Sequence, residues 1–451
     1  MNETFRKYLE EAIGHQNALV AFSAFESPAS VSVRLNPFKQ GCTLHGRPVP
    51  WNRHGMMLDQ RPSFTLDPVF HAGAYYVQDS SSMFVGHVFR DVLSSIGLPS
   101  SRPLRVLDLC AAPGGKTTDL AASLREACGD RFILVANEVM KARVGVLADN
   151  VALWGDPNVV VTSDDPRTFA PLSGYFDIIL ADVPCSGEGM FRKDEQAQSQ
   201  WSEDNVALCE ARQRRIIADM WPSLSEGGVL IYSTCTFNRY ENDSNVRWIA
   251  ENLGAEMLPN SMAVDGIINT ECGYSLVPGF VEGEGQYCAA LRKISGPAES
   301  VVARQSKDKP QKQPAIPDGL DALFTVKMKF AMKGDMVTAV PEWIAQDVVM
   351  LRQSLHVIAA GCAVGTLKGK ILVPDADMAL SLMLAPDAFP RAEVDRQTAL
   401  SYLHRDAISL PDAPKGYVIV CHEGLPLGFV KNLGNRCNSL HPQSRRIRMT
   451  I

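Results

Sequence analysis

The sequence predicts an α/β protein built around a parallel, doubly wound sheet. Between residues 104 and 235, short apolar segments alternate with longer segments of helical periodicity, which is the pattern of parallel strands joined by crossover helices. Polar and small residues follow the apolar segments, as expected where the carboxyl ends of parallel strands meet at one ligand-binding edge. The expected strands are RVLDL (105–109), FILVANEV (132–139), VVVTS (159–163), FDIILADVP (176–184) and GGVLIYSTC (227–235). The expected helices are TTDLAASLREAC (117–128), KARVGVLADNVALWG (141–155) and one around ARQRRIIADMWPSL (211–224).

The composition is ordinary for a globular protein, with 46% hydrophobic and 21% charged residues. No apolar run approaches the roughly 20 residues that cross a bilayer. The first residues, MNETFRKYLEEAIGH, mix charges of both signs, unlike a signal peptide, so we expect a cytoplasmic protein without a membrane segment. The eleven cysteines are scattered without a Cys-x-x-Cys pair. They predict reduced thiols, and they argue against both a disulfide framework and a cysteine-rich metal site.

Composition divides the chain into four parts. Residues 1–100 predict an α+β extension packed on the sheet domain, and residues 101–293 hold the alternating pattern of the core. Residues 294–317 contain no aromatic residue and are rich in Pro, Ser, Lys and Gln, which is typical of a flexible linker. Residues 318–451 contain short apolar stretches with glycine turns around a helix near MALSLMLA. This last part is expected to be an α+β region that ends in a small, largely β module.

The stretch LDLCAAPGGKTTDL (107–120) is similar to a phosphate-binding loop, because it ends in Gly115-Lys116-Thr117. Such a loop needs G-x-x-x-x-G-K-[ST], and Cys110 stands where its first glycine should be. That difference disfavours a nucleotide triphosphatase. A glycine-rich turn between strand and helix can instead let the backbone approach a nucleoside closely, and a plain tight turn is the alternative.

Carboxylates follow the next two strands. Glu138 ends the second strand about 20 residues beyond the glycine turn, where nucleoside sites place a ribose-binding carboxylate. A glutamate at a strand end is also common on protein surfaces. Asp164 or Asp165 follows the third strand and can read an adenine amino group, or cap a helix or turn.

The fourth and fifth strands end in cysteine-containing loops, LADVPCSGEGM and IYSTCTFNRYEN. The topology therefore brings Cys185 and Cys235 to the same edge as Glu138. A single strand-terminal cysteine is ordinarily an inert core residue, but two in adjacent loops of a binding edge favour chemistry. All nine histidines lie at or before His87 or at or after His356. A site built from residues 88–355 must therefore work without a histidine base or metal ligand.

A nucleoside cofactor, a carboxylate and two thiols suit methylation at carbon 5 of a pyrimidine. That carbon is not nucleophilic in the intact ring. A thiolate that adds to carbon 6, with a carboxyl group hydrogen-bonded to ring nitrogen 3, creates an enamine whose carbon 5 can attack a sulfonium methyl group. Loss of the carbon 5 proton and of the thiol then restores the ring.

Three motifs carry a resemblance to a known family. CAAPGGKT (110–117), DVPCSGEG (182–189) and STCT (233–236), in this order and spacing, are similar to the RNA cytosine-5 methyltransferases of the Nop/Sun type. Within that family the chain most resembles the RsmF-like bacterial enzymes that act on small-subunit ribosomal RNA. SVRLNPFK and YYVQDSSSM resemble the family's N-terminal segment, and GLPLGFVKNLGNR resembles its PUA-like RNA-binding module. The resemblance implies a Rossmann-like methyltransferase core and a C-terminal PUA-like module.

The resemblance also implies S-adenosyl-L-methionine as the cofactor. It places Glu138 at the ribose and Asp182 near the reacting end of the cofactor. It favours Asp165 near the adenine, because this aspartate precedes a small residue and then Arg167, as in the family. The implied contacts with the glycine turn are Cys110, Ala111, Ala112, Pro113, Gly114, Gly115 and Lys116.

The two cysteines have different roles in the family that the chain resembles. The cysteine of the Thr-Cys motif is the nucleophile, which implies this role for Cys235. Cys185, in the Pro-Cys motif, resembles the second cysteine, which assists breakdown of the covalent adduct. DNA cytosine methyltransferases use their Pro-Cys cysteine as nucleophile, so sequence chemistry alone leaves the two assignments open. Val183 stands where the family often has alanine, which is a conservative change.

A net charge of -6 does not indicate nucleic-acid binding, so contact with RNA must depend on local basic patches. Arg192 and Lys193 lie next to the DVPCSGEG motif and can hold phosphates or form salt bridges. The C-terminal segment has no acidic residue after its first lysine, and is either a phosphate-binding edge or a solvated tail. Its basic residues are Lys431, Arg436, Arg445, Arg446 and Arg448.

We therefore expect an enzyme that forms 5-methylcytosine in ribosomal RNA, either in the naked RNA or within the small ribosomal subunit. A transfer-RNA cytosine-5 methyltransferase is the alternative within the enzyme class. A weakly catalytic RNA-binding factor for ribosome assembly is the alternative outside it. No membrane partner and no metal are expected.

Overall fold

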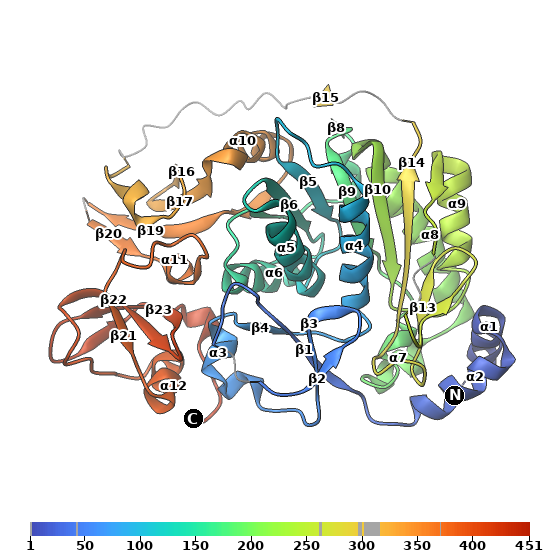
Figure 1. The fold of residues 1–451 in the computed structure, drawn as a ribbon, viewed down its shortest axis with the longest axis horizontal. Helices are drawn as coiled ribbons and strands as arrows, with labels where there is room; N and C mark the ends of the chain where they lie inside the picture. The colour runs from blue at the N-terminus through green and yellow to red at the C-terminus, as the bar shows by residue number, and fades with distance from the viewer. Residues whose placement is uncertain (1, 42–43, 261–263, 296–299, 302–315, 370) are drawn as a thin grey trace.

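A computed structural model of the chain describes residues 2–41, 44–260, 264–295, 300–301, 316–369 and 371–451. A large central sheet is flanked by helices, and smaller sheets are formed by the two ends of the chain (Figure 1). Most of the predicted linker, residues 294–317, lies outside the described residues. Within it, β15 (Ser300–Val301) pairs with β8 (Leu172–Ser173).

The central sheet has ten strands in the order β12-β13-β14-β10-β9-β5-β6-β7-β18, with β11 added on β14. The strands from β7 to β10 in this order are parallel, whereas β14 and β18 are antiparallel to their neighbours. The chain leaves β5 in one direction toward β6 and β7, and later continues on the other side through β9 and β10. In doubly wound sheets ligands bind outside the carboxyl ends of the strands at such a reversal, which here lies between β5 and β9. The bounds are β5 (Leu104–Asp108), β6 (Phe132–Asn137), β7 (Val159–Thr162), β9 (Phe176–Asp182), β10 (Leu224–Thr234), β11 (Ala255–Met257), β12 (Ile268–Asn269), β13 (Tyr274–Leu276), β14 (Gln286–Lys293) and β18 (Val357–Ala360).

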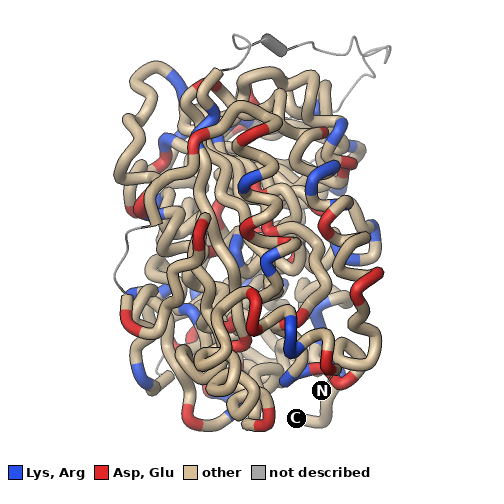
Figure 2. The backbone as a smooth tube through the Cα atoms, turned by 90° about the vertical axis from the view of Figure 1, so that its right-hand side faces the viewer, with Lys and Arg blue, Asp and Glu red and all other residues tan. Residues whose placement is uncertain are grey.

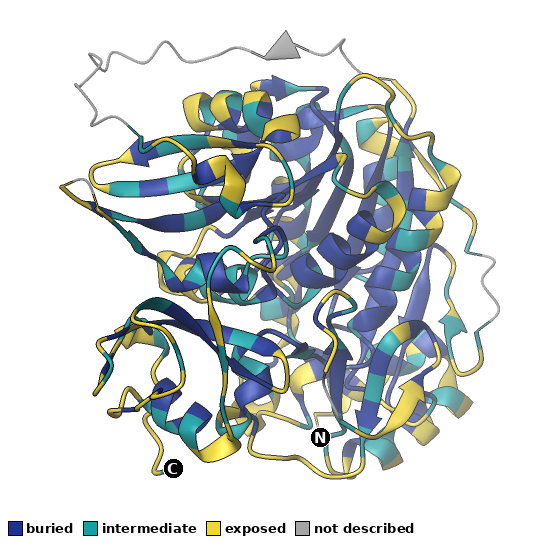
Figure 3. Ribbon diagram, turned by 60° about the vertical axis from the view of Figure 1, so that its left-hand side comes forward, coloured by how far each residue is buried: buried dark blue, intermediate teal, exposed yellow. Residues whose placement is uncertain are grey.

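Helices cover both faces of this sheet, as a doubly wound fold requires. Successive residues of a strand point to opposite faces, so Val106 packs in one helical layer and Leu107 in the other. The strands of the sheet are consequently buried along most of their length (Figure 3). One layer contains α4 (Met83–Ser95), α5 (Gly115–Cys128) and α6 (Lys141–Trp154), and the other contains α8 (Glu203–Met220), α9 (Asp243–Leu253) and α10 (Ala345–Ser354).

The structure confirms the predicted fold class and each of the five predicted core strands. The helix expected around residues 211–224 begins earlier, at Glu203, because Ser202 caps it by accepting a hydrogen bond from Asn205 N at 3.1 Å. The short α7 (Glu195–Gln200) precedes this cap.

The N-terminal region is α+β, as expected. α1 (Glu3–Ile13) and α2 (His15–Phe25) precede a four-stranded antiparallel sheet of order β2-β3-β1-β4, and α3 (Pro68–His71) precedes β4. Arg34 of this sheet is completely buried, and its guanidinium donates to Gly115 O at 3.1 Å. The N-terminal sheet is thereby fixed to the glycine turn of the core. The strands are β1 (Val31–Leu35), β2 (Arg47–Val49), β3 (Asn52–Leu58) and β4 (Tyr75–Val77).

The C-terminal region contributes two further four-stranded sheets and one strand of the central sheet. We expected the stretch HVIAAGCAV to belong to the small C-terminal module. Its first part is instead β18, which pairs antiparallel with β7 and covers an edge of the core that would otherwise be open. One sheet is formed by β16 (Met328–Lys333), β17 (Met336–Pro341), β19 (Cys362–Lys368) and β20 (Ile371–Pro374), followed by α11 (Ala376–Leu380). The last sheet is formed by β21 (Arg391–Glu393), β22 (Gly416–His422), β23 (Leu425–Asn432) and β24 (Cys437–Ser439), with α12 (Arg396–His404).

Candidate active site

Cys185 and Cys235 lie together at the carboxyl edge of the central sheet. β9 and β10 are parallel neighbours, with Ser233 paired beside Asp182 near their ends. Each cysteine follows the end of its strand, and the two Sγ atoms are 3.2 Å apart. Both are free cysteines. The structure therefore brings the two predicted thiols into direct contact, and their separate roles stay predictions.

The loops that carry the thiols are hydrogen-bonded to each other. Gly189 N donates to Cys235 O at 2.7 Å, and the hydroxyl oxygens of Ser186 and Thr236 are 2.9 Å apart. A Cβ atom on Gly189 would lie 2.8 Å from the same carbonyl oxygen. A larger residue at position 189 would therefore separate the loops and with them the thiols.

The buried carboxylate of Glu188 stabilises the contact between the two loops. Glu188 is 1% exposed and accepts hydrogen bonds from Trp201 Nε1 at 2.9 Å and Phe237 N at 2.7 Å. It also accepts from the backbone and the side-chain nitrogen of Asn238, at 3.1 and 2.8 Å. Glu188 thus joins the loop after β9 to the loop after β10. Its sequence setting, between two glycines, gave no signal of burial.

A second buried carboxylate, Glu241, repeats this arrangement. It accepts from Ser186 N at 3.0 Å, from Gln213 Nε2 at 2.7 Å and from Asn238 Nδ2 at 2.9 Å. Burial, and then the nearby charge of Glu188, raises the pKa of Glu241 to about 7. Sequence reasoning missed both glutamates, because an acidic residue in a polar loop ordinarily faces solvent.

Asp182 is held rigidly beside the thiol loops. Lys116 Nζ lies 2.8 Å from its Oδ2, while Ser233 Oγ and Gln286 Nε2 donate to Oδ1 at 3.0 and 3.2 Å. Burial alone would lower the pKa of Lys116, but the adjacent Asp182 carboxylate outweighs it and raises this pKa above its ordinary value. Lys116 therefore keeps its positive charge at neutral pH. Sequence reasoning did not identify Gln286, which reaches the site from the antiparallel β14.

The glycine turn joins β5 to α5 at the same edge. Gly114 has a φ of 111°, in the left-handed region that favours glycine, and α5 begins at the next residue. Ala111 N donates to Asn137 O at 2.8 Å, and Asn150 Nδ2 donates to Pro113 O at 2.8 Å. The backbone of the turn is thus fixed by β6 on one side and α6 on the other.

Two buried groups lie under this turn. Asp108 accepts from Thr117 Oγ1 at 2.7 Å, and its Oδ1 has no hydrogen-bond partner among the described residues. Burial raises the pKa of Asp108 to about 7. Burial also raises the pKa of the Cys110 thiol, so Cys110 is a packing residue and not a third nucleophile.

The predicted cofactor carboxylates lie beyond β6 and β7. Glu138 is 3% exposed, caps Met140 N at 2.8 Å and pairs with Arg143 at 3.4 Å. Asp165 caps a short 3₁₀ turn through Arg167 N at 3.2 Å. Asp164 accepts from His356 N at 2.8 Å, in the C-terminal region. The adenine-side role of Asp165 stays a prediction.

The surroundings of Cys185 favour its protonated form. The hydrogen bond to Cys235, and then burial, raises the pKa of Cys185 well above its ordinary value. Cys185 therefore keeps its proton at neutral pH. Either sulfur can donate in the contact between the two thiols.

Basic residues near the site are largely engaged in ion pairs. Arg192 lies 2.7 Å from Glu284, and Lys193 lies 3.2 Å from Asp79, so both form the salt bridges that were one of the two expectations for them. Positive and negative residues are interspersed along the side of the molecule seen in Figure 2. Within the basic C-terminal segment, Arg445 is paired with aspartates of α6 and α11. The exposed members of that segment are Lys431, Arg436, Arg446 and Arg448.

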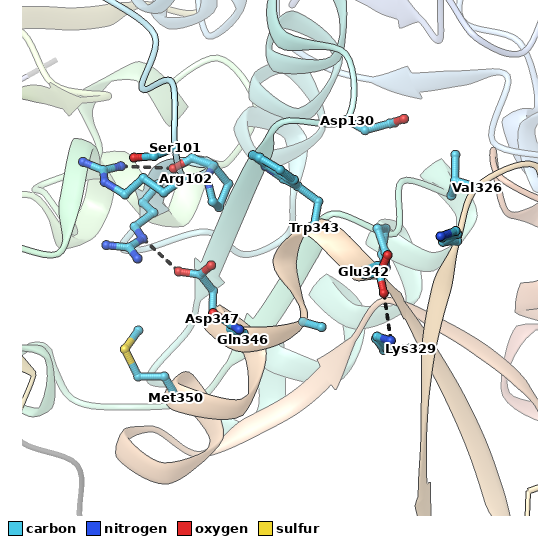
Figure 4. A pocket seen from close by; sticks show the side chains of 15 residues that line it. Ser101, Arg102, Asp130, Val326, Lys329, Glu342, Trp343, Gln346, Asp347 and Met350 are labelled. Atoms are coloured by element: carbon cyan, nitrogen blue, oxygen red, sulfur yellow. Dashed lines mark hydrogen bonds and ion pairs between the residues drawn. The ribbon is translucent and has the colours of Figure 1, made fainter.

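A cavity of about 720 Å³ lies at the opposite edge of the sheet, far from the thiols. Trp343 and the Lys329–Glu342 ion pair come from the C-terminal region, and Arg102 precedes β5 (Figure 4). None of the predicted site residues lines it. The convergence of thiols, a fixed carboxylate and a glycine turn therefore locates the candidate site better than cavity volume does.

Two observations on the described part of the chain concern membranes and metals. None of its helices has the length and apolar character that a membrane crossing requires. Its His, Cys, Asp and Glu side chains form no group of three or more that could hold a metal ion.

Comparison with known proteins gives the class of this site. Residues 98–292 match the family model of the 16S rRNA methyltransferases RsmB/F, and these residues contain the whole thiol and glycine-turn arrangement. A crystal structure of a methyltransferase homologue from Pyrococcus horikoshii superposes with a TM-score of 0.54 and 26% identity, over 65% of this chain and 95% of that one. The core is thus that of an RNA methyltransferase.

The flanking regions make the assignment narrower. Residues 1–80 match the N-terminal domain of 16S rRNA methyltransferase RsmF, and residues 389–447 match the PUA domain of methyltransferase RsmF. The ribosomal RNA small subunit methyltransferase F of Salmonella agona is 30% identical over 93% of this chain and 91% of its own length. The Pectobacterium atrosepticum protein of the same name is 34% identical over 64% of this chain and 61% of its own. The chain belongs to the RsmF family of ribosomal RNA small subunit methyltransferases, which use S-adenosylmethionine.

Proposed function

We propose that this protein methylates carbon 5 of cytosine in small-subunit ribosomal RNA through a covalent cysteine adduct. The observation that carries the proposal is the 3.2 Å contact between Cys185 and Cys235, beside the Asp182–Lys116 ion pair. Methylation of an exocyclic amine or of a ribose hydroxyl has no need of a thiol. A pair of adjacent thiols suits addition to, and release from, a pyrimidine ring.

The residues at the glycine turn fit the methyl donor. The backbone from Cys110 to Lys116 lies at the carboxyl edge of the sheet, where a turn between strand and helix can approach a nucleoside closely. Glu138 would hold the ribose, Asp165 the adenine, and Asp182 the reacting end. When bound, S-adenosylmethionine supplies an electrophilic methyl group.

The side chains of this site then carry out the remaining chemistry on cytosine. The Cys235 thiolate forms a bond to carbon 6. Asp182, as a carboxylic acid, donates its proton to ring nitrogen 3, where negative charge develops, and takes this proton back when the ring is restored. The electron pair released into the ring makes carbon 5 nucleophilic, and this carbon receives the methyl group. A base then takes the carbon 5 proton, the carbon 6–sulfur bond breaks, and Cys235 leaves as a thiolate.

Cys185 assists the last of these steps. Its raised pKa keeps it protonated, so its S–H group donates to the sulfur of Cys235 as negative charge returns to that atom. Without this donor the adduct would break down slowly. The geometry thus supports the division of roles that the family resemblance implies.

Ribosomal RNA as the substrate is supported by the relatives and by the C-terminal region. The similar proteins are named for the small ribosomal subunit, and residues 389–447 match a PUA domain. A cytosine inside a duplex must be extruded at a cost of a few kcal/mol, so the target is expected in a flexible or unpaired segment.

The decisive experiment is the transfer of labelled methyl groups from S-adenosylmethionine to three acceptors in parallel. These are naked small-subunit ribosomal RNA, small subunits that lack the modification, and unmodified bulk transfer RNA. Label recovered as 5-methylcytosine in either ribosomal acceptor supports the proposal and shows which form is recognised. Label only in transfer RNA would overturn the substrate, and a methylated base other than 5-methylcytosine would overturn the chemistry. No label, with cofactor binding intact, would favour an assembly factor.

A further inference from the structure

A small cavity lined by aromatic side chains lies behind the glycine turn, between β4, α6 and the segment around α3. Its volume is about 170 Å³, and its walls include Phe70, Tyr75, Tyr76 and Trp154, together with Val77 of β4 and Asn150 of α6. None of these residues takes part in the chemistry proposed above. Four aromatic rings around one small cavity form a wall suited to a flat, unsaturated ring.

The size of the cavity limits what it can hold. A cavity of about 150 Å³ in a protein interior accommodates one benzene ring. The present cavity is therefore large enough for a single six-membered ring. Aromatic side chains that stack on unpaired bases are the usual means by which proteins bind single-stranded RNA.

Polar groups in the wall are hydrogen-bond donors. Trp154 is 2% exposed, and its Nε1–H has no hydrogen-bond partner among the described residues. Burial raises the pKa of Tyr76 to about 12, so this phenol keeps its proton at neutral pH. The Arg34 guanidinium lies 4.6 Å from the centre of the Trp154 ring and holds the ring in place. Such donors complement the carbonyl oxygens of a pyrimidine.

Residues that line the cavity contact the glycine turn, and the neighbouring Asp149 contacts the C-terminal region. Asn150 donates to Pro113 O at 2.8 Å, and a Cβ on Gly115 would lie 3.3 Å from the Tyr76 ring. The residue before Asn150 is Asp149, which pairs with Arg445 at 2.8 Å. RNA that passes from the PUA-matching region toward the thiols would therefore run close to this cavity.

We propose that this cavity binds an unpaired pyrimidine base of the RNA substrate, distinct from the cytosine that is methylated. The proposal rests on the proposed function, because it assumes an RNA acceptor. The base stacks on the aromatic wall and accepts hydrogen bonds from Trp154 and Tyr76. The site thus contributes to the choice of RNA and not to methyl transfer itself.

The test is the methyl-transfer kinetics of two variants with small-subunit ribosomal RNA as the acceptor. Val77→Phe fills the cavity and should raise the KM for RNA about tenfold, as expected for the loss of one stacked base. Tyr76→Phe keeps the ring and removes one donor, and should raise this KM about threefold. Both variants should keep the wild-type kcat and the wild-type KM for S-adenosylmethionine. Trp343→Ala, which removes an aromatic side chain from the distant 720 Å³ cavity, is the control and should leave all three constants unchanged.

A second measurement keeps the proposal open to refutation if either variant folds poorly. Wild-type protein is cross-linked to RNA transcripts containing 4-thiouridine or 5-iodocytidine, and the attached peptides are identified by mass spectrometry. Attachment within residues 70–77 or 150–154 supports the proposal. Attachment only elsewhere, or an unchanged KM for RNA in the folded Val77→Phe variant, shows that the cavity is a packing feature. Failure of the wild-type enzyme to methylate any RNA would instead refute the proposed function.

Discussion

The two edges of the central sheet contain similar kinds of side chain in different settings. At the carboxyl edge, Asp182 is fixed by three donors, and two thiols lie in contact above buried glutamates. At the opposite edge, the larger cavity is bordered by an exposed tryptophan and by the surface ion pair of Lys329 with Glu342. Burial converts ordinary polar residues into groups with fixed positions and shifted pKa values. The comparison indicates that a cluster of buried polar groups is a better guide to the proposed reactive edge than the volume of a cavity.

The largest expected effect is the loss of Cys235, the proposed nucleophile. Cys235→Ser should reduce methyl transfer by about 10³-fold or more, because a serine hydroxyl at this position has no base to activate it. Cys185→Ser should instead accumulate enzyme attached to RNA, seen as a retarded band on a denaturing gel. Cys128→Ser, at the far end of α5, is the control and should retain full activity. Equal losses without adduct in both site variants would contradict the divided roles.

The next effect concerns the stability of the reactive edge. Glu188→Ala leaves the Trp201 indole N–H and the backbone N–H groups of Phe237 and Asn238 without an acceptor, and should lower the free energy of unfolding by about 4 kcal/mol. Urea unfolding followed by tryptophan fluorescence measures this change. Glu342→Ala is the matched substitution at the opposite edge, where solvent replaces the lost ion pair, and no measurable change is expected. Similar losses in both variants would show that the two edges do not differ as described.

A pH dependence should distinguish the two edges as well. The Glu241 carboxyl has an ordinary pKa of 4.5, and burial followed by Glu188 raises its pKa to about 7 in the folded protein. Between these pH values the folded state binds a proton that the unfolded state has lost, so the stability from this group falls as pH rises through the window. The expected loss, relative to Glu241→Gln, is about 3 kcal/mol.

The measurement is a set of urea titrations between pH 4.5 and pH 7 for wild type, Glu241→Gln and Glu342→Gln. The hydrogen bond from Lys329 lowers the pKa of Glu342, so ionisation of this exposed group does not lower the stability as pH rises. Wild type and Glu342→Gln should therefore lose stability in parallel, and Glu241→Gln should lose less. Parallel curves for all three proteins would mean that Glu241 is ionised in the folded state throughout.

The sequence was sufficient to predict the core strands and to bring the predicted site residues to one edge of the sheet. This is because hydrophobic periodicity is local, and because parallel strands joined by helices have their carboxyl ends at one edge. The placement of Cys185 and Cys235 in one site follows from that rule alone. Their contact distance does not, because it depends on hydrogen bonds between loops.

The features that were missed depend on pairings between distant segments. Nothing in HVIAAGCAV indicates that β18 joins β7 in the core and not its neighbours in sequence. Glu188 and Glu241 have the sequence surroundings of surface residues, and only the folded loops bury them. Gln286 contributes to the site because β14 runs antiparallel to β10, a pairing that local periodicity does not specify.

The smallest expected effect tests this last residue. Gln286 Nε2 donates to Asp182 Oδ1 at 3.2 Å and also to Ser233 Oγ at 2.6 Å. Gln286→Met keeps the length of the side chain and removes these donors, so Asp182 loses one of its three fixed partners but keeps Lys116. We expect kcat to fall about tenfold with little change in the KM for S-adenosylmethionine, because one hydrogen bond to a charged group is worth about 1.5 kcal/mol or more.

The same substitution at the opposite edge completes the comparison. Gln346 is exposed and lines the 720 Å³ cavity, so Gln346→Met removes an amide that solvent already satisfies. Its kcat should stay at the wild-type value. If Gln286→Met also kept the wild-type kcat, the position of Asp182 would depend on Lys116 and Ser233 alone, and β14 would serve only to cover the sheet. If both variants lost activity equally, the two edges would be coupled through the sheet, and the reactive edge would not be the independent unit that its local hydrogen bonds indicate.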